Sequence, residues 1–590
     1  MRNGDVGTEE RYFGPTSLPS LALAIKDAII EHLDPETERS REYALLVEQK
    51  IDAIISRGEG IMTRGGHLPT VPPFTILDAM IEPYFTAISP HFPIWTKSKF
   101  IQMATDLRCS PAPDEDLASI ICCNNLILMT LTANSLCFRR GSIPQDKQAR
   151  KTSSLDLDVT AGFLANSKRA ISNVGSLLAP SVINVQALIS LCVVAQEHLP
   201  SSTFETLFGL TAQVAKAVGI HQWHSFRSQL GDEESLERRN ISYCLYILDK
   251  TVCWTTGTSP SIPVSDIYTE PIEASETSSE TYLTTKVELA MIQETIYSEM
   301  YACRMDGRNE DEIRQIVSRT WQGLETWMVN SGTDLDGVEK ALEYPSLKFE
   351  MAIGCLYSQL LLIWPYGDHL DTMFQQRTEI ARRYMKMILG FWNLASDPGH
   401  HSILTRIIAS QSPLYLHEMF VRIIGGQGQD SDIDMLRKFS EMIQTVTDAR
   451  EETSYGRRLY ELSHILVDFL DIIKTKHKRR RVDSTSEETS SLSSTQYDLF
   501  GSFRGMDLDT SYFLGTGIGN PSPKPKATEP RRSYSDLNLR QWLDPLGIVG
   551  SASSGVAERR NSRPTDEFAS IMGAYANGVF DSPSSPIYEP

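Results

Sequence analysis

The most metal-like pattern in the sequence is a pair of histidines three positions apart, His221 and His224. Imidazole is a common zinc ligand, but a zinc site normally uses three or four protein ligands. No cysteine or carboxylate stands beside this pair at a spacing typical of such a site. We therefore expect no metal site here, and no cofactor in this part of the chain.

The nine cysteines show no arrangement typical of a metal or redox site. No two have C-x-x-C spacing, and most lie in apolar stretches of helical character, where a free cysteine behaves as a small hydrophobic residue. The adjacent Cys122 and Cys123 have no evident partner that would activate a thiolate. With no disulfide framework, and no secretory signal in the first ten residues, the sequence indicates a reducing, intracellular environment.

Other catalytic patterns are missing or stand in the wrong context. The glycine-rich run 515–519 neither follows a strand nor opens a helix, so it does not fit a phosphate-binding loop. The sequence contains no Walker loop, no nucleophile elbow and no H-E-x-x-H motif. We therefore expect that the protein is not an enzyme and has no catalytic residues.

Charge and hydropathy limit the classes of partner. The chain has 590 residues and a formal net charge of −19. Because DNA affinity depends first on neutralising phosphates with Lys and Arg, the chain as a whole is poorly suited to bind DNA, although a small basic module could lie within it. The longest apolar runs, 182–195 and 351–364, are shorter than the roughly 20 residues that span a bilayer. We therefore expect no membrane segment.

The stretch 234–263 organises the rest of the chain. It begins with charged residues, continues as an apolar helix and ends in a turn rich in Gly, Ser and Pro. This order is typical of a buried helix with a charged entrance and a turn-forming exit. Its diagnostic positions, called here the signature residues, are Glu237, Arg238, Arg239, Leu248, Asp249, Gly257 and Pro260.

The signature residues resemble the motif of the fungal-specific transcription factor domain, the regulatory middle homology region of fungal zinc-cluster regulators. The Gly-Thr-Ser-Pro turn after the helix is looser than the Gly-Arg-Pro that family members often carry. The resemblance extends over residues 11–473. Four further segments carry it: an aromatic-Gly-Pro segment at 11–18, a helix followed by a Phe-Pro-Ile step at 76–100, a small-residue helix at 204–221, and an aromatic-rich helix that closes on a proline at 347–365.

Residues 89–95 predict a sharp turn, because Pro90 and Pro93 cannot continue the preceding helix. His91 fits a turn residue better than a metal ligand. The apolar residues of the turn should fold back onto the core; they are Phe92, Ile94 and Trp95.

The fold class predicted for the chain is all-α, a large helical regulatory domain followed by a disordered C-terminal tail. Apolar residues recur at three- and four-residue spacing, and no alternation is long enough to build a sheet. Long helical segments are expected at 21–57, 403–424 and 435–473, and Gly219 suits a helix C-cap. The predicted organisation is an N-terminal strap at 1–17, the helical domain at 18–473, a basic segment at 474–482 and the tail at 483–590.

The basic segment is typical of a nuclear import signal. The alternative is a solvated cluster that ends a helix, since cations favour helix C-termini. We favour import because the expected disordered tail leaves the run accessible. The residues concerned are Lys474, Lys476, Lys478, Arg479, Arg480 and Arg481.

The tail is rich in Ser, Gly, Pro and Asp, a composition that predicts disorder. Islands such as 506–514 and 537–546 place acidic residues beside Trp, Phe and Leu, which suits activation segments that fold on contact with coactivators. Ser535 and Ser562 follow arginine pairs and are candidate kinase sites. Mass spectrometry that finds both serines unmodified in every growth condition would exclude this assignment.

The resemblance implies a nuclear regulator of RNA polymerase II transcription whose tail contacts the transcription machinery or coactivators. It also implies a six-cysteine zinc cluster upstream, which reads DNA with a helix in the major groove. No cysteine precedes Cys109, so we expect that module to be absent from this chain, with zinc present only if such a cluster exists. The alternative function is a helical scaffold or inhibitor that binds no DNA and pairs with a zinc-cluster factor. Homodimerisation stays open.

Overall fold

All residues that the computed structural model describes fall in the first of two compact units, Met1–Asp507. They form helices, turns and connecting segments, and no strand occurs among them, so the all-α fold class is confirmed. The described ranges are 12–33, 36–58, 67–110, 112, 116–141, 154–269, 278–302, 308–340, 346–366, 371–394, 398–448 and 450–485.

The described residues of the first half of the helical unit form nine α-helices. They are α1 (Leu18–Glu31), α2 (Glu38–Ser56), α3 (Phe74–Pro83), α4 (Lys97–Cys109), α5 (Leu117–Gly141), α6 (Ser154–Ser172), α7 (Val182–His198), α8 (Ser201–Val218) and the one-turn α9 (Trp223–Phe226). The second half follows with α10 (Asp232–Thr256), α11 (Ser278–Met300), α12 (Glu310–Asn330), α13 (Leu335–Lys340), α14 (Ser346–Ile363), α15 (Asp371–Leu394), α16 (Pro398–Ser410), α17 (Leu414–Ile424), α18 (Asp430–Thr447) and α19 (Tyr455–Thr485).

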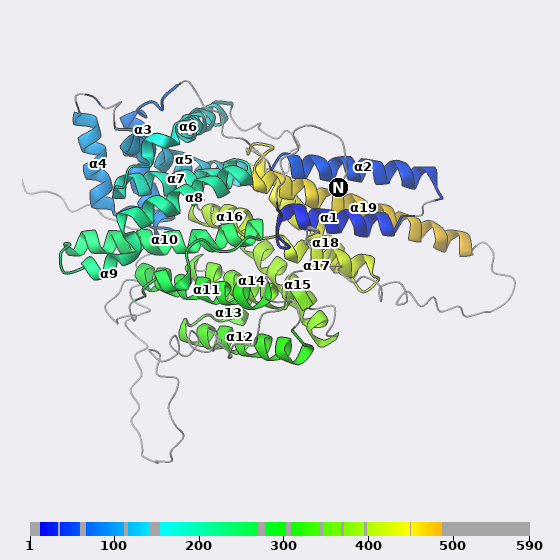
Figure 1. The fold of residues 1–590 in the computed structure, drawn as a ribbon. Helices are drawn as coiled ribbons and strands as arrows, with labels where there is room; N and C mark the ends of the chain where they lie inside the picture. The colour runs from blue at the N-terminus through cyan, green and yellow to red at the C-terminus, as the bar shows by residue number, and fades with distance from the viewer. Residues whose placement is uncertain are drawn as a thin grey trace, which may run out of the picture. The chain divides into compact units, whose positions relative to one another are not determined.

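Helix α10, which carries most of the signature residues, lies between α8 and α11 (Figure 1). It packs against α7 and α8 on one side and against α11 on the other, and α11 packs in turn against α12 and α14. The first two helices, α1 and α2, lie beside α19, so the two ends of the helical unit close against each other (Figure 1). The signature helix is therefore surrounded by segments from both halves of the chain.

Local sequence explains several helix ends. Helix α8 stops at Gly219, whose φ of 76° is left-handed, so the predicted glycine C-cap is confirmed. Helix α12 starts with a capping box, in which Asn309 and Glu312 each bond the other's backbone N–H. Every residue of α7 from Val185 to the end of the helix is buried, which accounts for its apolar run. None of the described helices combines the length and apolar character that crossing a bilayer requires.

Three predicted helical segments are interrupted. Residues 21–57 form two helices, since α1 ends at Glu31 and α2 begins at Glu38. Residues 403–424 divide at Pro413, which N-caps α17 and has no N–H with which to continue α16. Residues 435–473 divide into α18 and α19.

The break between α18 and α19 has a tertiary cause. The connection is held by Arg450, whose guanidinium contacts His198 and lies 3.2 Å from a carboxylate oxygen of Glu197, all three side chains being buried. A local pattern cannot reveal such a contact between segments some 250 positions apart.

The backbone of α19 continues through the predicted import signal to Thr485. The side chains of that run, and residues 486–590, lie outside the described part of the chain. The activation segments and both candidate phosphorylation sites therefore stay predictions.

The predicted turn at 89–95 is confirmed. Helix α3 is followed by a π-helical turn, Tyr84–Ile88, and a 3-10 turn, Ser89–His91. The chain then folds back as expected, with 6% or less of each predicted apolar side chain exposed: Phe92, Ile94 and Trp95.

Helix α11 carries a buried carboxyl group that should make stability depend on pH. Burial raises the pKa of Glu288 from 4.5 to about 7. Between these pH values the native protein holds a proton that the unfolded chain releases, so the free energy of unfolding should fall as pH rises, by at most about 3 kcal/mol. We expect Glu288→Gln to flatten this slope in urea titrations at pH 5, 6 and 7. An unchanged slope would contradict the assignment.

Candidate functional site

The charged entrance of the signature helix is tied to neighbouring elements. Glu237 is buried; it accepts hydrogen bonds from Lys99 at 2.7 Å and from Gln186 at 3.0 Å. Arg238 pairs with Glu234 one turn earlier, and Arg239 reaches Glu280 at the start of α11. These signature residues therefore fix the position of α10 against α4, α7 and α11.

The end of the signature helix holds a buried ion cluster. Lys250 Nζ donates to Asp249 at 2.8 Å, to the backbone carbonyl of Ile262 at 2.8 Å, and lies 2.7 Å from Glu294. Its ammonium also lies 4.0 Å from the centre of the Tyr246 ring. All three N–H donors of this lysine are used, although it is only 1% exposed.

The same cluster holds the turn that follows the helix. The carboxylate of Asp249 accepts the backbone N–H groups of Ser261 and Ile262 at 2.8 and 3.1 Å. Burial raises the pKa of Asp249, and Lys250 and the two N–H groups oppose that rise. Glu294 accepts the backbone N–H of Val264 at 2.9 Å. Asp249 and Lys250 thus act as a clamp between α10, α11 and the turn at 257–264.

The turn begins at Gly257, which is in contact with the N-terminal strap, residues 12–17. Gly257 has a φ of 71°, a conformation that favours glycine. Gly14 crosses directly over it and donates its N–H to the carbonyl of Thr256 at 3.0 Å. A Cβ at Gly14 would lie 2.0 Å from the Gly257 carbonyl oxygen, so only glycine allows the two backbones to approach this closely.

The strap continues inward at Thr16, which is fully buried. Its hydroxyl donates to the carbonyl of Trp254 at 2.9 Å, and its own carbonyl accepts from the Ser412 hydroxyl. The backbone N–H of Ser412 donates in turn to the Tyr357 hydroxyl at 2.8 Å. The strap therefore connects α10, α14 and the link between α16 and α17.

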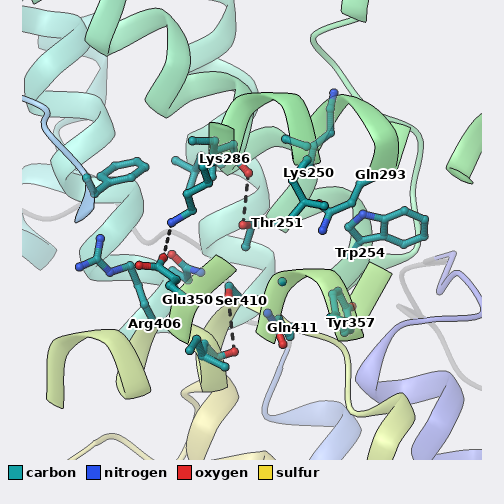
Figure 2. A pocket seen from close by; sticks show the side chains of 18 of the residues that line it. Lys250, Thr251, Trp254, Lys286, Gln293, Glu350, Tyr357, Arg406, Ser410 and Gln411 are labelled. Carbon is teal, nitrogen blue, oxygen red and sulfur yellow. Dashed lines mark hydrogen bonds and ion pairs between the residues drawn. The ribbon is translucent and has the colours of Figure 1, made fainter. Parts of the chain in front are cut away.

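Trp254 and Tyr357 also line a central cavity of about 100 Å³ (Figure 2). Its walls come from α7, α10, α11, α14 and α16, and from Phe92, which follows the 3-10 turn Ser89–His91. The residues that line the cavity come from positions between 92 and 411 of the chain. The cavity volume is large enough for several water molecules or a small ligand.

On one side of the cavity, Lys286 of α11 pairs with Glu350 of α14 (Figure 2). The two carboxylate oxygens of Glu350 are bonded separately, one to Lys286 and the other to His91 Nδ1 at 2.9 Å. Burial alone would raise the pKa of Glu350, but Lys286 and His91 hold it well below its usual value. Burial lowers the pKa of His91, which favours a neutral imidazole that donates to Glu350.

Arg406, on α16, lies on the same side of the cavity (Figure 2). Its Nη2 donates to the Ser402 hydroxyl at 3.2 Å, and its guanidinium carbon lies 5.9 Å from the centre of the Phe92 ring. No carboxylate of the described residues forms an ion pair with it. A guanidinium has five N–H donors, so most of them stay available.

The histidine pair examined first lies elsewhere, in two consecutive short helices. His221 is in the 3-10 turn Ile220–Gln222 and His224 is in α9. The ring of His224 stacks on that of Tyr268, with 4.4 Å between the ring centres. Within the described ranges, no three His, Cys, Asp or Glu side chains are grouped so as to hold a metal ion.

The described cysteines follow the sequence prediction that most of them lie in apolar stretches. Six are buried, and Cys109 is exposed. Burial raises the pKa of the six buried thiols, for Cys123 and Cys192 to about 12, which disfavours the reactive thiolate.

The structure thus brings the signature residues onto one helix and its turn, with Leu248 lining the cavity and Gly257 against the strap. Pro260 is half-buried in the turn. Sequence reasoning missed the charged residues of the cavity, Glu350 and Arg406, and gave His91 no role beyond the turn. Only a pattern linking distant segments could have found them.

Residues 81–324 match the family described as the fungal specific transcription factor domain. This range contains α10, α11 and every signature residue. The resemblance inferred from the sequence is confirmed.

Three curated proteins illustrate the relationship. The chain is 46% identical over 481 residues to "Transcription factor sphG" of Aspergillus fumigatus. The aligned region covers 81% of this chain and 65% of that protein. It is 23% identical to "Transcription factor oryO" of Aspergillus oryzae over 69% of this chain and 52% of that protein. A transcriptional regulatory protein of Schizosaccharomyces pombe is 21% identical over 50% of this chain and 39% of its own length. The chain thus spans less than two thirds of each relative. No solved structure gives a significant match.

Proposed function

We propose that this protein is a nuclear regulator of transcription by RNA polymerase II, and not an enzyme. The observation that carries the proposal is the fungal specific transcription factor domain at residues 81–324, together with relatives that are named transcription factors. The helical unit is the regulatory part. The basic run from Lys474 to Arg481 directs nuclear import, and the tail contacts the transcription machinery or coactivators.

DNA recognition is proposed to lie outside the described helices. Family resemblance implies a zinc cluster built on six cysteines, and no cysteine precedes Cys109. We propose that the described helices bind neither zinc nor DNA. DNA contact would then come from a zinc cluster joined to this chain, from a zinc-cluster partner, or from a second copy of such a chain.

A tethered reporter assay tests the proposal without depending on DNA recognition by the chain. The full chain is fused to an unrelated DNA-binding domain whose sites precede a reporter gene. We expect at least a tenfold rise in reporter transcript, lost when residues 483–590 are removed. The control is the DNA-binding domain alone, expressed at the same level.

The same assay separates the alternative function. A scaffold or inhibitor would leave the tethered reporter unchanged. Expressed without a tether, it would lower the activity of a co-purifying zinc-cluster factor. That pair of results would contradict an activator and favour sequestration of a partner.

A further inference from the structure

We propose that the central cavity binds a small organic anion, with Arg406 as its charged anchor. The inference rests on the proposed function, in which the helical unit is the regulatory part of the protein. It names the chemical class of ligand that this part would sense. The argument depends on which charges around the cavity are already used within the protein.

Two of the three cations that line the cavity are neutralised. Lys250 has its three donors on Asp249, Glu294 and a backbone carbonyl, and its ammonium points away from the cavity (Figure 2). Lys286 is paired with Glu350. The second oxygen of Glu350 is taken by His91, so this carboxylate has no oxygen left without a partner.

Arg406 is the remaining cation. Its contacts are one neutral hydroxyl, at Ser402, and the face of Phe92. Its charge is close enough to lower the pKa of Glu350 without forming an ion pair. The planar guanidinium fork matches a carboxylate in a bidentate geometry, and such a charge-assisted pair is strong where water is excluded. The free donors therefore favour an anion over a cation or a neutral ligand.

The rest of the lining indicates an organic anion. Apolar side chains from four elements border the space beside the charged wall: Phe92, Leu289, Met351 and Ile407. An inorganic anion would leave these surfaces in contact with water, whereas a hydrocarbon group would cover them. A volume of about 100 Å³ limits the ligand to a few carbon atoms or one small ring.

The cavity also adjoins the strap. The carbonyl of Trp254 accepts from Thr16, and Tyr357 is linked to Thr16 through Ser412. A ligand against Trp254 and Tyr357 would therefore contact the wall to which the strap is bonded. This places the proposed ligand where it can act on the start of the helical unit.

Titration calorimetry on the purified full chain tests the inference with isobutyrate, benzoate and phenylacetate as probes. Their uncharged amides serve as matched ligands. We expect at least one acid to bind at least tenfold more tightly than its amide. Arg406→Gln should lower the affinity for that acid at least tenfold. Arg314→Gln, the same change at an exposed position on α12, should leave the affinity unchanged.

A second variant guards against misfolding of the first. Ala290→Leu fills the cavity without changing charge and should abolish binding of the acid, with helical circular dichroism retained. Equal binding of acid and amide, wild-type affinity in Arg406→Gln or Ala290→Leu, or no acid binding below about 10 mM would overturn the inference. Calorimetry does not depend on reporter activity, so failure of the anion site and failure of the proposed regulatory function give different results.

Discussion

Gly257→Ala should destabilise the helical unit by at least about 3 kcal/mol, because it combines a left-handed backbone with a backbone collision. A Cβ at Gly257 would lie 2.5 Å from two backbone atoms of Gly14. The strap cannot move away without breaking the bonds of Gly14 to Thr256 and of Thr16 to Trp254. Urea unfolding followed by circular dichroism gives the difference in unfolding free energy.

The chain provides a matched control in Gly332. This glycine also has a left-handed φ, 62°, but nothing lies within 4 Å of a Cβ built on it. Gly332→Ala should cost only the conformational penalty, about 1 kcal/mol. Gly14→Ala supplies the complementary case, a collision without the left-handed φ. Equal losses for Gly257→Ala and Gly332→Ala would show that the strap does not press on the turn.

Lys250→Met should be the second severe change. It removes the cation shared by Asp249 and Glu294 and leaves the buried carboxylate of Asp249 and the partly buried carboxylate of Glu294 without it. Breaking a buried ion pair on one side typically costs about 3–5 kcal/mol, because the remaining charge is uncompensated. The backbone carbonyl of Ile262 would lose its donor as well. The free energy of unfolding should fall accordingly in urea titrations.

A double substitution distinguishes charge from packing. Adding Asp249→Asn to Lys250→Met removes one stranded charge and should recover part of the lost stability. Arg314→Met breaks the exposed pair with Glu310 on α12 and should cost less than about 0.5 kcal/mol. If Lys250→Met were as mild as Arg314→Met, the cluster would not be what holds the turn to the helix.

Much of the fold could be predicted because it depends on local chemistry. The apolar spacing of the body predicts helices, the prolines at 90 and 93 predict the turn, and Gly219 predicts a helix end. The signature residues indicated the family because their order along one helix is itself a local pattern. The break at Pro413 has a local signal that the prediction passed over, since a proline has no N–H to continue a helix. The break after Thr447 is held by a tertiary contact, Arg450 with Glu197.

The cavity could not be predicted for a related reason. His91 and Glu350 stand 259 positions apart, and Gly14 meets Gly257 across a similar separation. Each residue alone has an ordinary explanation as a turn, a surface charge or a loop glycine. Their roles come from the packing of five helices, which no single segment of the sequence specifies.

The central claim is that this protein regulates transcription from the nucleus, and transcript profiling after rapid induction tests it most directly. The full chain is compared with a variant in which all six basic residues are changed to alanine: Lys474, Lys476, Lys478, Arg479, Arg480 and Arg481. We expect a defined set of transcripts to change at least several-fold with the wild-type chain and to stay constant with the variant. A transcript profile that the wild-type chain leaves unchanged would contradict the claim.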